Sequence, residues 1–512
     1  MRSFPDALVR GLLYQNALPW SILRHEHVIG ASGDEKKKAI LATSGAVWYN
    51  IRHMKIQRRD FLRTASAASF LAFPALRAAA ASPNGKVNMA FIGIGNRGYT
   101  DFSMFAYYRD LVNIVALCDT QMGAKHTANT LKACPSVPRF KDFREMFDKL
   151  APQIDAVCIA TPDFSHFPAA MLAMSLGKAV FCEKPLGNNF REIELMTRAA
   201  AKFKVVTQMG NQGHSDGNYW QCRELVRKGF LKNVTRINAF MCASRRWHKW
   251  NGTMKDMPGG ETPPEELDWN IWQSQRPERS YSVNYINGDW RCFYEYGTGA
   301  LGDWGAHIFD APWELLKFGL PEKIEVLRDE GRTDAVYPMT SDLVYHFPAR
   351  GPGLPACRLE WRDGIGNLPP MPKNLSDPKW KRPKPYGSEI YTSDGRVFAR
   401  GTHGDVMTAI AGLDPKDPVV RKTLRDYPRG KSGHYLNFLN AVRGSEKANS
   451  PFETSGPLSQ VMALGALAQR LGEPVLNFDR KTKRFMGNDR ANAFLDGPPP
   501  RKGWEQFEKL GV

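Results

Sequence analysis

The chain contains 512 residues, of which 42% are hydrophobic and 24% charged, and its formal net charge is +18. This length predicts roughly two to four domains, and the composition excludes global disorder. Part of the positive excess lies in the first 81 residues, and no later block combines Lys or Arg with interleaved aromatics. We therefore expect a moderately basic enzyme with no nucleic-acid partner.

The eight cysteines show no CxxC or other metal-ligand spacing, so we expect no metal site. Cys118, Cys158 and Cys182 each fall near the end of an apolar run, which is typical of small buried hydrophobic side chains. The cysteines therefore neither require nor exclude an oxidising compartment.

Residues 54–81 have the three parts of a twin-arginine export signal. Arg58 and Arg59 precede a short apolar stretch, and a run of alanines follows it. The stretch is too short to span a bilayer comfortably, so we expect export to the periplasm without stable membrane insertion after cleavage. Because such a signal belongs near an N-terminus, we interpret residues 1–53 as an over-called start preceding Met54. The alternative is a genuine disordered extension.

A dinucleotide-binding pattern begins at Val87. The apolar run Val87–Ile92 predicts a buried parallel strand, and the glycine-rich sequence Gly93-Ile94-Gly95-Asn96-Arg97-Gly98 follows it directly. Gly93 permits the tight turn, Gly95 admits a pyrophosphate, and Gly98 allows close helix packing. A second predicted strand ends at Asp119, whose carboxylate suits ribose hydroxyls and repels a 2′-phosphate. We therefore expect NAD, in preference to NADP, as the cofactor.

Strands and helices alternate over residues 86–211, which predicts a doubly wound parallel sheet. Further strands are predicted at 155–160, 179–182 and 205–209, with helices at 143–150, 166–176 and 191–203. Ligands bind at the carboxyl ends of such strands. The loops at these ends supply the remaining expected cofactor contacts, which are Thr161, Pro162, His166, Glu183, Lys184, Asn211 and Gln212. His166 has the alternative interpretation of anchoring its turn.

Three motifs carry a resemblance to a known family. Ala160-Thr161-Pro162-Asp163, Cys182-Glu183-Lys184-Pro185-Leu186 and Gly302-Asp303-Trp304-Gly305-Ala306-His307 resemble segments of the Gfo/Idh/MocA oxidoreductases. The resemblance extends from about residue 86 to about residue 507. It implies a Rossmann domain followed, over residues 212–512, by an α+β substrate and oligomerisation domain with a large, mostly antiparallel open sheet. It also implies NAD(P), carbohydrate-like substrates and homo-oligomers.

The segment from Gly302 to Lys317 is expected to form one helix. Asp303, His307 and Asp310 would then share a face, because their spacing is i, i+4, i+7. The resemblance implies that His307 is the general base and that Asp303 holds a substrate hydroxyl or orients the imidazole. The spacing alone also fits a helix start capped by Asp303 with His307 paired locally. We interpret Asp310 as structural.

Lys184 follows a predicted strand and precedes Pro185, which favours an extended backbone. Its ammonium could then stabilise an alkoxide on the reacting carbon. Without the resemblance, a solvated loop lysine is the favoured explanation of Lys184. Glu183 would fix the loop or pair with Lys184.

The second domain has aromatic and basic residues suited to sugars or sugar acids. We expect Arg245 and Trp247 to bind substrate together with Asp303 and His307, although core packing explains most single tryptophans. The wider set comprises Arg246, His248, Trp250, Trp269, Trp272, Trp290 and Arg291. The Pro- and Gly-rich stretch 351–384 predicts a long irregular insertion.

These patterns together predict an exported NAD-dependent oxidoreductase acting on a secondary hydroxyl or keto group of a sugar or polyol. Two alternatives stay open. One is an NAD-dependent glycosidase that acts through a transient keto sugar, which the resemblance includes. The other is a non-catalytic sugar-binding relative, against which the presence of Lys184, Asp303 and His307 argues.

Overall fold

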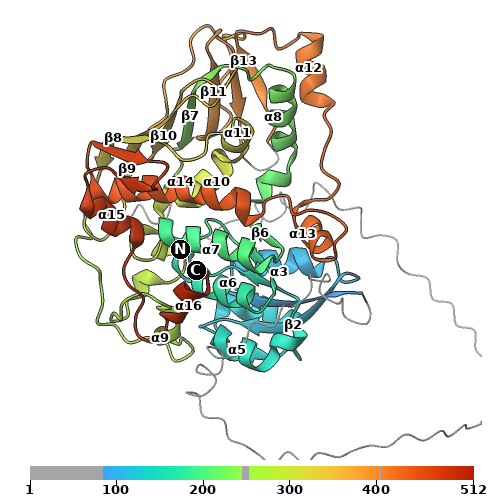
Figure 1. Cartoon of the computed structure of the whole chain (residues 1–512), viewed down its shortest axis with the longest axis vertical. Coiled ribbons are helices and arrows are strands. Elements are labelled where there is room, and N and C mark those ends of the chain that lie inside the picture. The colour runs from blue at the N-terminus through green and yellow to red at the C-terminus, as the bar shows by residue number, and fades with distance from the viewer. Residues whose placement is uncertain (1–84, 245–252, 403–404, 512) are drawn as a thin grey trace, which may run out of the picture. The chain divides into compact units, whose positions relative to one another are not determined.

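The computed structural model describes residues 85–244, 253–402 and 405–511 (Figure 1). The expected export signal and residues 1–53 lie outside this range, as do Arg245 and Trp247. No helix within the described residues is long and apolar enough to cross a membrane.

A six-stranded parallel sheet forms the first half of the described chain. Its spatial order β3-β2-β1-β4-β5-β6 is that of a dinucleotide-binding Rossmann sheet, so this prediction is confirmed. Strands β1, β4 and β5 are almost wholly buried because helices cover both faces. The strands are β1 Val87–Ile92, β2 Val112–Cys118, β3 Arg139–Phe140, β4 Ala156–Ile159, β5 Ala179–Cys182 and β6 Thr207–Met209.

Helices from both ends of the chain cover this sheet. Those of the first half are α3 Arg97–Ala106, α4 Ala128–Ala133, α5 Phe143–Leu150, α6 His166–Ser175 and α7 Phe190–Phe203. The C-terminal helix α13 (His434–Val442) packs on α3, and α16 (Gln506–Leu510) packs on α6 (Figure 1). Asp142 and Asn189 cap α5 and α7, each accepting a backbone N–H in the first turn.

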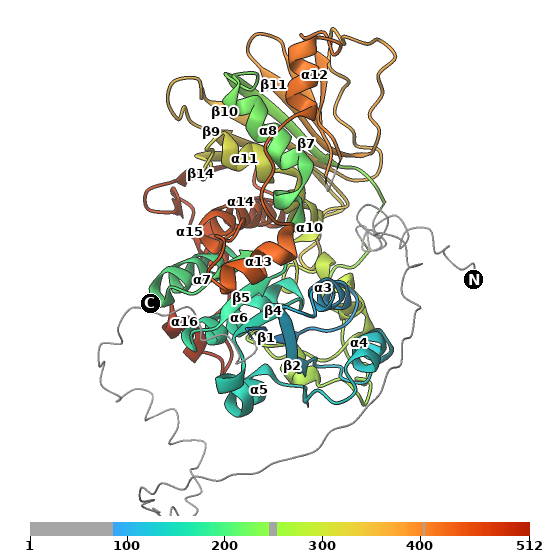
Figure 2. The same cartoon turned by 90° about the vertical axis from the view of Figure 1, so that its right-hand side faces the viewer.

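The second sheet has nine strands in the order β13-β12-β11-β7-β10-β9-β8-β14-β15 and is antiparallel except for the β7–β10 pair. This confirms the expected large, mostly antiparallel sheet. Helix α14 packs against α10 and strand β8, and α12 packs on α8 (Figure 2). The strands are β7 Val234–Met241, β8 Lys323–Glu330, β9 Thr340–Phe347, β10 Cys357–Asp363, β11 Tyr386–Thr392, β12 Val397–Arg400, β13 Thr408–Ala411, β14 Val475–Asp479 and β15 Arg484–Phe485. The helices are α8 Gly217–Arg227, α9 Trp269–Trp272, α10 Gly299–Ile308, α11 Asp310–Leu315, α12 Pro418–Arg425, α14 Phe452–Leu471 and α15 Asp489–Asp496.

The interpretation of residues 351–384 as wholly irregular is wrong. Residues Cys357–Asp363 form β10, an interior strand that pairs with both β7 and β9. Its side chains alternate between buried and more exposed positions, as a strand with one covered face requires. The flanking prolines and glycines obscured that alternation. No helix or strand is assigned between Asp363 and Tyr386.

The expected continuous helix from Gly302 to Lys317 is also wrong. Helix α10 ends at Ile308, and α11 begins at Asp310. Pro312 explains the interruption, because proline has no N–H and its ring clashes with the carbonyl four residues earlier. That carbonyl belongs to Ile308. Asp310 therefore lies on a separate helix from Asp303 and His307.

Candidate active site

The glycine-rich loop after β1 is tightly packed against its neighbours. Gly93 has φ +82°, and a Cβ there would lie 2.7 Å from the carbonyl oxygen of Ala160. A Cβ on Gly98 would lie 2.0 Å from the Gly93 carbonyl oxygen. Both positions therefore require glycine, and the loop brings its backbone against the cavity that we describe next.

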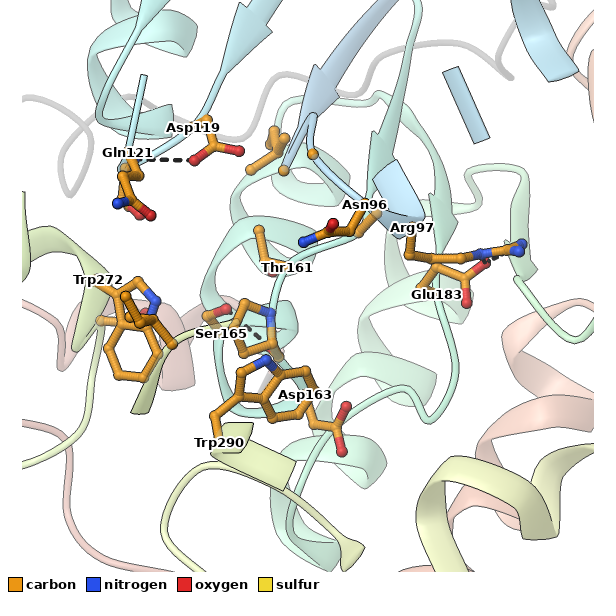
Figure 3. Close-up of a pocket in the computed structure, with 18 of the residues that line it drawn as sticks. Asn96, Arg97, Asp119, Gln121, Thr161, Asp163, Ser165, Glu183, Trp272 and Trp290 are labelled. Atoms are coloured by element: carbon orange, nitrogen blue, oxygen red, sulfur yellow. Dashed lines mark hydrogen bonds and ion pairs between the residues drawn. The ribbon is translucent and has the colours of Figure 1, made fainter. Parts of the chain in front are cut away.

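A cavity of about 320 Å³ runs along the carboxyl ends of the parallel strands, and we name it the dinucleotide cavity. Figure 3 shows Asp119 and Gln121 at one end, Thr161 in the middle and Trp290 at the other end. Residues of both halves of the chain line it, because Trp272, Trp290 and Arg291 belong to the second half. Its volume falls in the usual range of small-molecule sites.

Asp119 lies at one end of this cavity (Figure 3). Its two carboxylate oxygens accept hydrogen bonds from the backbone N–H groups of Ile94 (3.0 Å) and Gln121 (2.9 Å). Each oxygen retains a lone pair for a ligand hydroxyl. The Nε2 atom of His126 lies 3.8 Å from Asp119, and this hydrogen-bonding partner raises the pKa of His126.

Glu183, at the carboxyl end of β5, holds the loops around it. It accepts hydrogen bonds from Nε of Arg97 (3.0 Å) and from Nε2 of Gln212 (2.9 Å). Burial opposes ionisation of Glu183, but the neighbouring cations outweigh it and lower its pKa. Figure 3 shows Arg97 directed to Glu183. Glu183 therefore fixes the side chains of Arg97 and Gln212. Arg97 also lines the dinucleotide cavity.

Lys184, which lines the cavity, is paired with Asp303, which does not line it. The Nζ atom of Lys184 donates to the backbone carbonyl and to the Oδ1 atom of Asp303, at 2.7 Å in each case. Nε of Arg291 lies 3.3 Å from the same Oδ1 atom. An ammonium has three N–H donors, so Lys184 keeps one for a ligand. Lys184 and Arg291 both line the cavity.

Asp163 is a second carboxylate close to this pair. It is 4% exposed and accepts a hydrogen bond from Oγ1 of Thr298 at 2.6 Å. Burial raises the pKa of Asp163 to about 6, although Arg291, Thr298 and Lys184 act in the opposite direction. Asp163 therefore changes charge close to neutral pH at the lining of the dinucleotide cavity.

His307 lies one helical turn after Asp303, on the same face of α10, and is 6% exposed. The end of this helix is held by Arg400 of β12, which donates to the carbonyl oxygens of His307 (3.0 Å) and Ile308 (3.2 Å). These are carbonyls that the interruption before Pro312 leaves without helix partners. Arg400 therefore fixes the segment on which His307 sits.

The buried His214 and Asp310 form a cluster with the partly exposed Glu314 beside this segment. This cluster is the candidate metal-ligand group among the described residues. The two ring nitrogens of His214 face different carboxylates, Asp310 at 2.8 Å and Glu314 at 3.4 Å. Burial alone would lower the pKa of His214, but the two carboxylates raise it. The two carboxylates therefore favour the protonated form of His214, in which each ring nitrogen would pair with one of them.

Two sequence models of one oxidoreductase family match the chain consecutively. The NAD-binding Rossmann fold matches residues 87–211, and the C-terminal alpha/beta domain matches residues 218–347. The chain belongs to the Gfo/Idh/MocA oxidoreductase family. The expectation of an NAD-binding domain is thereby confirmed.

Curated relatives of this Gfo/Idh/MocA chain match over a limited length. A glycosyl hydrolase family 109 protein of Shewanella sp. (strain MR-4) is 27% identical over 168 residues, which is 31% of this chain and 36% of the relative. An alpha-N-acetylgalactosaminidase of Shewanella oneidensis has the same identity and coverage. An uncharacterised oxidoreductase of Schizosaccharomyces pombe is 29% identical over 134 residues, 26% of this chain and 36% of the relative. The chain thus spans about a third of the length of these relatives.

Solved structures share the fold. The WlbA dehydrogenase of Chromobacterium violaceum, crystallised with NADH and UDP-GlcNAcA, has a TM-score of 0.55 and 12% identity, covering 78% of this chain and 97% of that one. The WlbA dehydrogenase of Bordetella pertussis has a TM-score of 0.52 and 13% identity, with coverage of 77% and 99%. At this identity the likeness shows the fold alone.

The residues of this Gfo/Idh/MocA chain fit an NAD molecule. The crowded glycines bring the backbone to the cavity, Asp119 keeps free lone pairs, and the buried Oγ1 atom of Thr161 has no hydrogen-bond partner among the described residues. Asn96 (φ 47°) and Pro162 also line the cavity. The pyrophosphate would lie at the loop from Gly93 to Gly98 and the ribose at Asp119.

Some predicted contacts take other positions. The ring nitrogens of His166 lie 2.9 Å from the backbone oxygens of Pro185 and Thr161, so the side chain joins two loops. Within the described residues, the dinucleotide cavity is not lined by His166, Asn211, Gln212, Asp303 or His307. Asn211 is fully buried, and its amide has no hydrogen-bond partner among the described residues.

Three site residues have no role in the sequence-based prediction, and they are Asp163, Thr298 and Arg400. A fourth, Arg291, belongs only to the wider set of residues suited to sugars. Asp163 stands in a motif of the family resemblance, but the sequence does not indicate the partners of Asp163 or Arg291. Nothing in the sequence around Arg400 indicates its role, because a buried arginine on a strand can be assigned one only when its acceptors on α10 are known.

Proposed function

We propose that this protein is an NAD-dependent oxidoreductase that oxidises a secondary hydroxyl, or reduces the corresponding keto group, of a sugar or polyol. The observation that carries the proposal is the ion pair between Lys184, which lines the dinucleotide cavity, and Asp303. A cation held against a carboxylate with one donor left suits an oxygen that gains negative charge. Bound NAD supplies the hydride acceptor in this chemistry.

Each side chain has a defined part in the proposed reaction. Asp303 holds the ammonium of Lys184 through two hydrogen bonds, and the third N–H of Lys184 binds the reacting oxygen and stabilises the alkoxide. His307 accepts the hydroxyl proton and returns it in the reverse direction. Arg291 and Trp290 close the substrate end and exclude water. We propose that Arg245 and Trp247 also contact the substrate.

Replacement of the two proposed reacting residues tests this mechanism. His307→Ala and Lys184→Ala should each lower turnover roughly 10²–10⁴-fold, the usual contribution of a positioned acid–base or electrostatic group. Binding of NAD should change little, because the glycine loop and Asp119 hold it. The exposed Lys422→Ala on α12 is the matched control and should retain full turnover. Near-normal turnover in His307→Ala would remove the general-base role.

The double variant adds a second criterion. If His307 and Lys184 act on the same proton transfer, the combined loss should be smaller than the product of the two single losses. Multiplicative losses would show that the two residues act in separate steps. Dissociation constants of NADH, measured for each variant by fluorescence, would separate effects on chemistry from effects on cofactor binding.

An NAD-dependent glycosidase is the second candidate, and the glycosyl hydrolase names of the curated relatives favour it. The first oxidation would use the same residues, after which the aglycone leaves and the hydride returns, so that no net redox change occurs. Release of the aglycone from a glycoside panel without accumulation of NADH would support this candidate. Accumulation of NADH with a stable keto sugar would support the dehydrogenase.

We also propose export through the twin-arginine machinery to the periplasm and assembly as a homo-oligomer. Export of a folded protein would allow NAD to be loaded first and recycled by alternating oxidation and reduction. The mature N-terminus should then fall between Ala79 and Pro83. N-terminal sequencing of the exported protein tests this, and a protein that still began at Met54 would contradict cleavage. Light scattering of the purified protein tests the oligomer.

A further inference from the structure

A second cavity, of about 350 Å³, lies behind the loop that carries Lys184. It is bounded by the start of α7, the C-terminal half of α14 and the end of α15. It shares no described lining residue with the dinucleotide cavity. Asn188, four residues after Lys184, is part of its wall. Its volume is within the range of small-molecule sites.

Three arginines line this second cavity, and two of them are neutralised. Arg276 makes two bonds to Glu192, at 3.0 and 3.1 Å, and Arg279 donates to Glu295 at 2.7 Å. Arg470 of α14 has no carboxylate partner within residues 85–244, 253–402 and 405–511. The cavity therefore holds one uncompensated positive charge.

Two aromatic rings hold Arg470 in place. Its guanidinium carbon lies 4.1 Å from the ring centre of Phe494 and 5.3 Å from that of Tyr294. Burial lowers the pKa of Arg470, as expected for a cation withdrawn from water without a full counter-charge. Ring faces attract a cation but do not accept its N–H groups in the way that an anion does.

Two residues of the cavity wall carry buried polar atoms that lack hydrogen-bond partners among the described residues. Tyr294 is 5% exposed, and its hydroxyl has no hydrogen-bond partner in the described part of the chain. Burial raises the pKa of Tyr294, so the phenol stays protonated and acts as a donor. The Oε1 atom of Glu295 also lacks a partner there and is an acceptor. The N-terminus of α7, capped by Asn189, adds positive potential.

These groups suit a ligand that carries both an anionic group and a neutral hydroxyl. Arg470 and the Tyr294 hydroxyl are donors for an anionic oxygen, whereas Glu295 accepts from a neutral hydroxyl. We propose that the second cavity binds a small hydroxylated organic anion, with its carboxylate or phosphate on Arg470 and Tyr294 and a hydroxyl on Glu295. Sugar acids and sugar phosphates have this chemistry. The proposal concerns a site separate from the one that carries the proposed reaction.

Isothermal titration of the NADH-loaded protein tests this inference. The probes are gluconate, glucose 6-phosphate and inorganic phosphate, with sorbitol as the uncharged control. Bound NADH fills the dinucleotide cavity and prevents oxidation of the probes. At least one sugar anion should bind with a stoichiometry of one per chain and more tightly than inorganic phosphate. Any binding of sorbitol, a polyol of the proposed substrate class, should be insensitive to Arg470→Gln. Whether gluconate or glucose 6-phosphate binds more tightly identifies the preferred anion.

Variants of residues in the two cavities show which cavity binds the anion. Arg470→Gln should weaken it about tenfold or more, and Tyr294→Phe about three- to tenfold, as loss of a hydrogen bond to a charged group predicts. Lys184→Ala should leave it unchanged. If Arg470→Gln does not fold, Tyr294→Phe decides the question. The proposal is overturned if no anion binds saturably, if neither variant weakens binding, or if Lys184→Ala abolishes it.

Discussion

Replacement of Arg400 by methionine would test how the end of α10 is held. The Arg400 guanidinium is buried, with the side chain 2% exposed, and donates to the carbonyl oxygens of His307 and Ile308 and to Oδ1 of Asn218 (3.2 Å). Methionine fills a similar volume but leaves these acceptors buried without a donor. Each unsatisfied group costs about 1–3 kcal/mol.

The expected loss of stability is smaller than the sum of these costs. Burial lowers the pKa of Arg400, which shows that the protein also bears a desolvation cost for this cation. Methionine removes that cost. Removal of one partner of a buried charged network typically reduces the free energy of unfolding by about 3–5 kcal/mol, and we expect a value in this range. A displacement of His307 by even 1 Å would lower turnover about 10²-fold.

Urea unfolding at neutral pH and steady-state turnover measure the two effects. Arg400→Lys is the control, because it keeps the charge and reaches fewer acceptors, and it should lose about half as much stability as Arg400→Met. Binding of NADH should not change in either variant. A loss below about 1 kcal/mol in Arg400→Met, or unchanged turnover, would refute the assigned role of Arg400.

Three further predictions follow from the Rossmann half. Asp119→Ser should narrow the preference for NAD over NADP, and tighter binding of NADP than of NAD by the unmodified protein would contradict the assignment. Gly98→Ala should weaken NADH binding at least tenfold, since its Cβ would lie 2.0 Å from the carbonyl oxygen of Gly93, whereas Gly433→Ala, which meets no atom within 4 Å, should not. Burial lowers the pKa of His434 to about 4, from an ordinary 6.5. The contribution of the neutral ring to the free energy of unfolding is therefore fully present above pH 6.5, and about 3 kcal/mol of it is lost as the pH falls from 6.5 through 4. Urea unfolding as a function of pH measures this loss, and His434→Asn should abolish the pH dependence.

The Rossmann half could be predicted from local sequence because its signals are local. A buried strand, a glycine-rich turn and an acidic residue at the end of the next strand lie within about 30 residues of each other, and the strand order follows from right-handed connections. Strand β1 has the predicted bounds Val87–Ile92. The large second sheet was expected through the family resemblance.

The remaining features of the fold and of the candidate site depend on contacts between segments that are distant in sequence. Lys184 and Asp303 are 119 positions apart, and Arg400 lies 93 positions from the carbonyl that it binds. Periodic patterns in the sequence do not predict such long-range contacts. The prolines and glycines around strand β10 obscure its alternating pattern, and the break before α11 depends on the clash of Pro312 with the carbonyl of Ile308.

Single-turnover reduction of bound cofactor tests the central proposal most directly. Protein loaded with one equivalent of NAD would be mixed with a panel of sugars, polyols and glycosides while nicotinamide absorbance is followed. We predict that at least one compound reduces the bound NAD, and that Lys184→Ala, with NAD still bound, does so roughly 10²–10⁴-fold more slowly. If no compound changes the redox state of the bound cofactor, or if Lys184→Ala keeps the full rate, the account is contradicted.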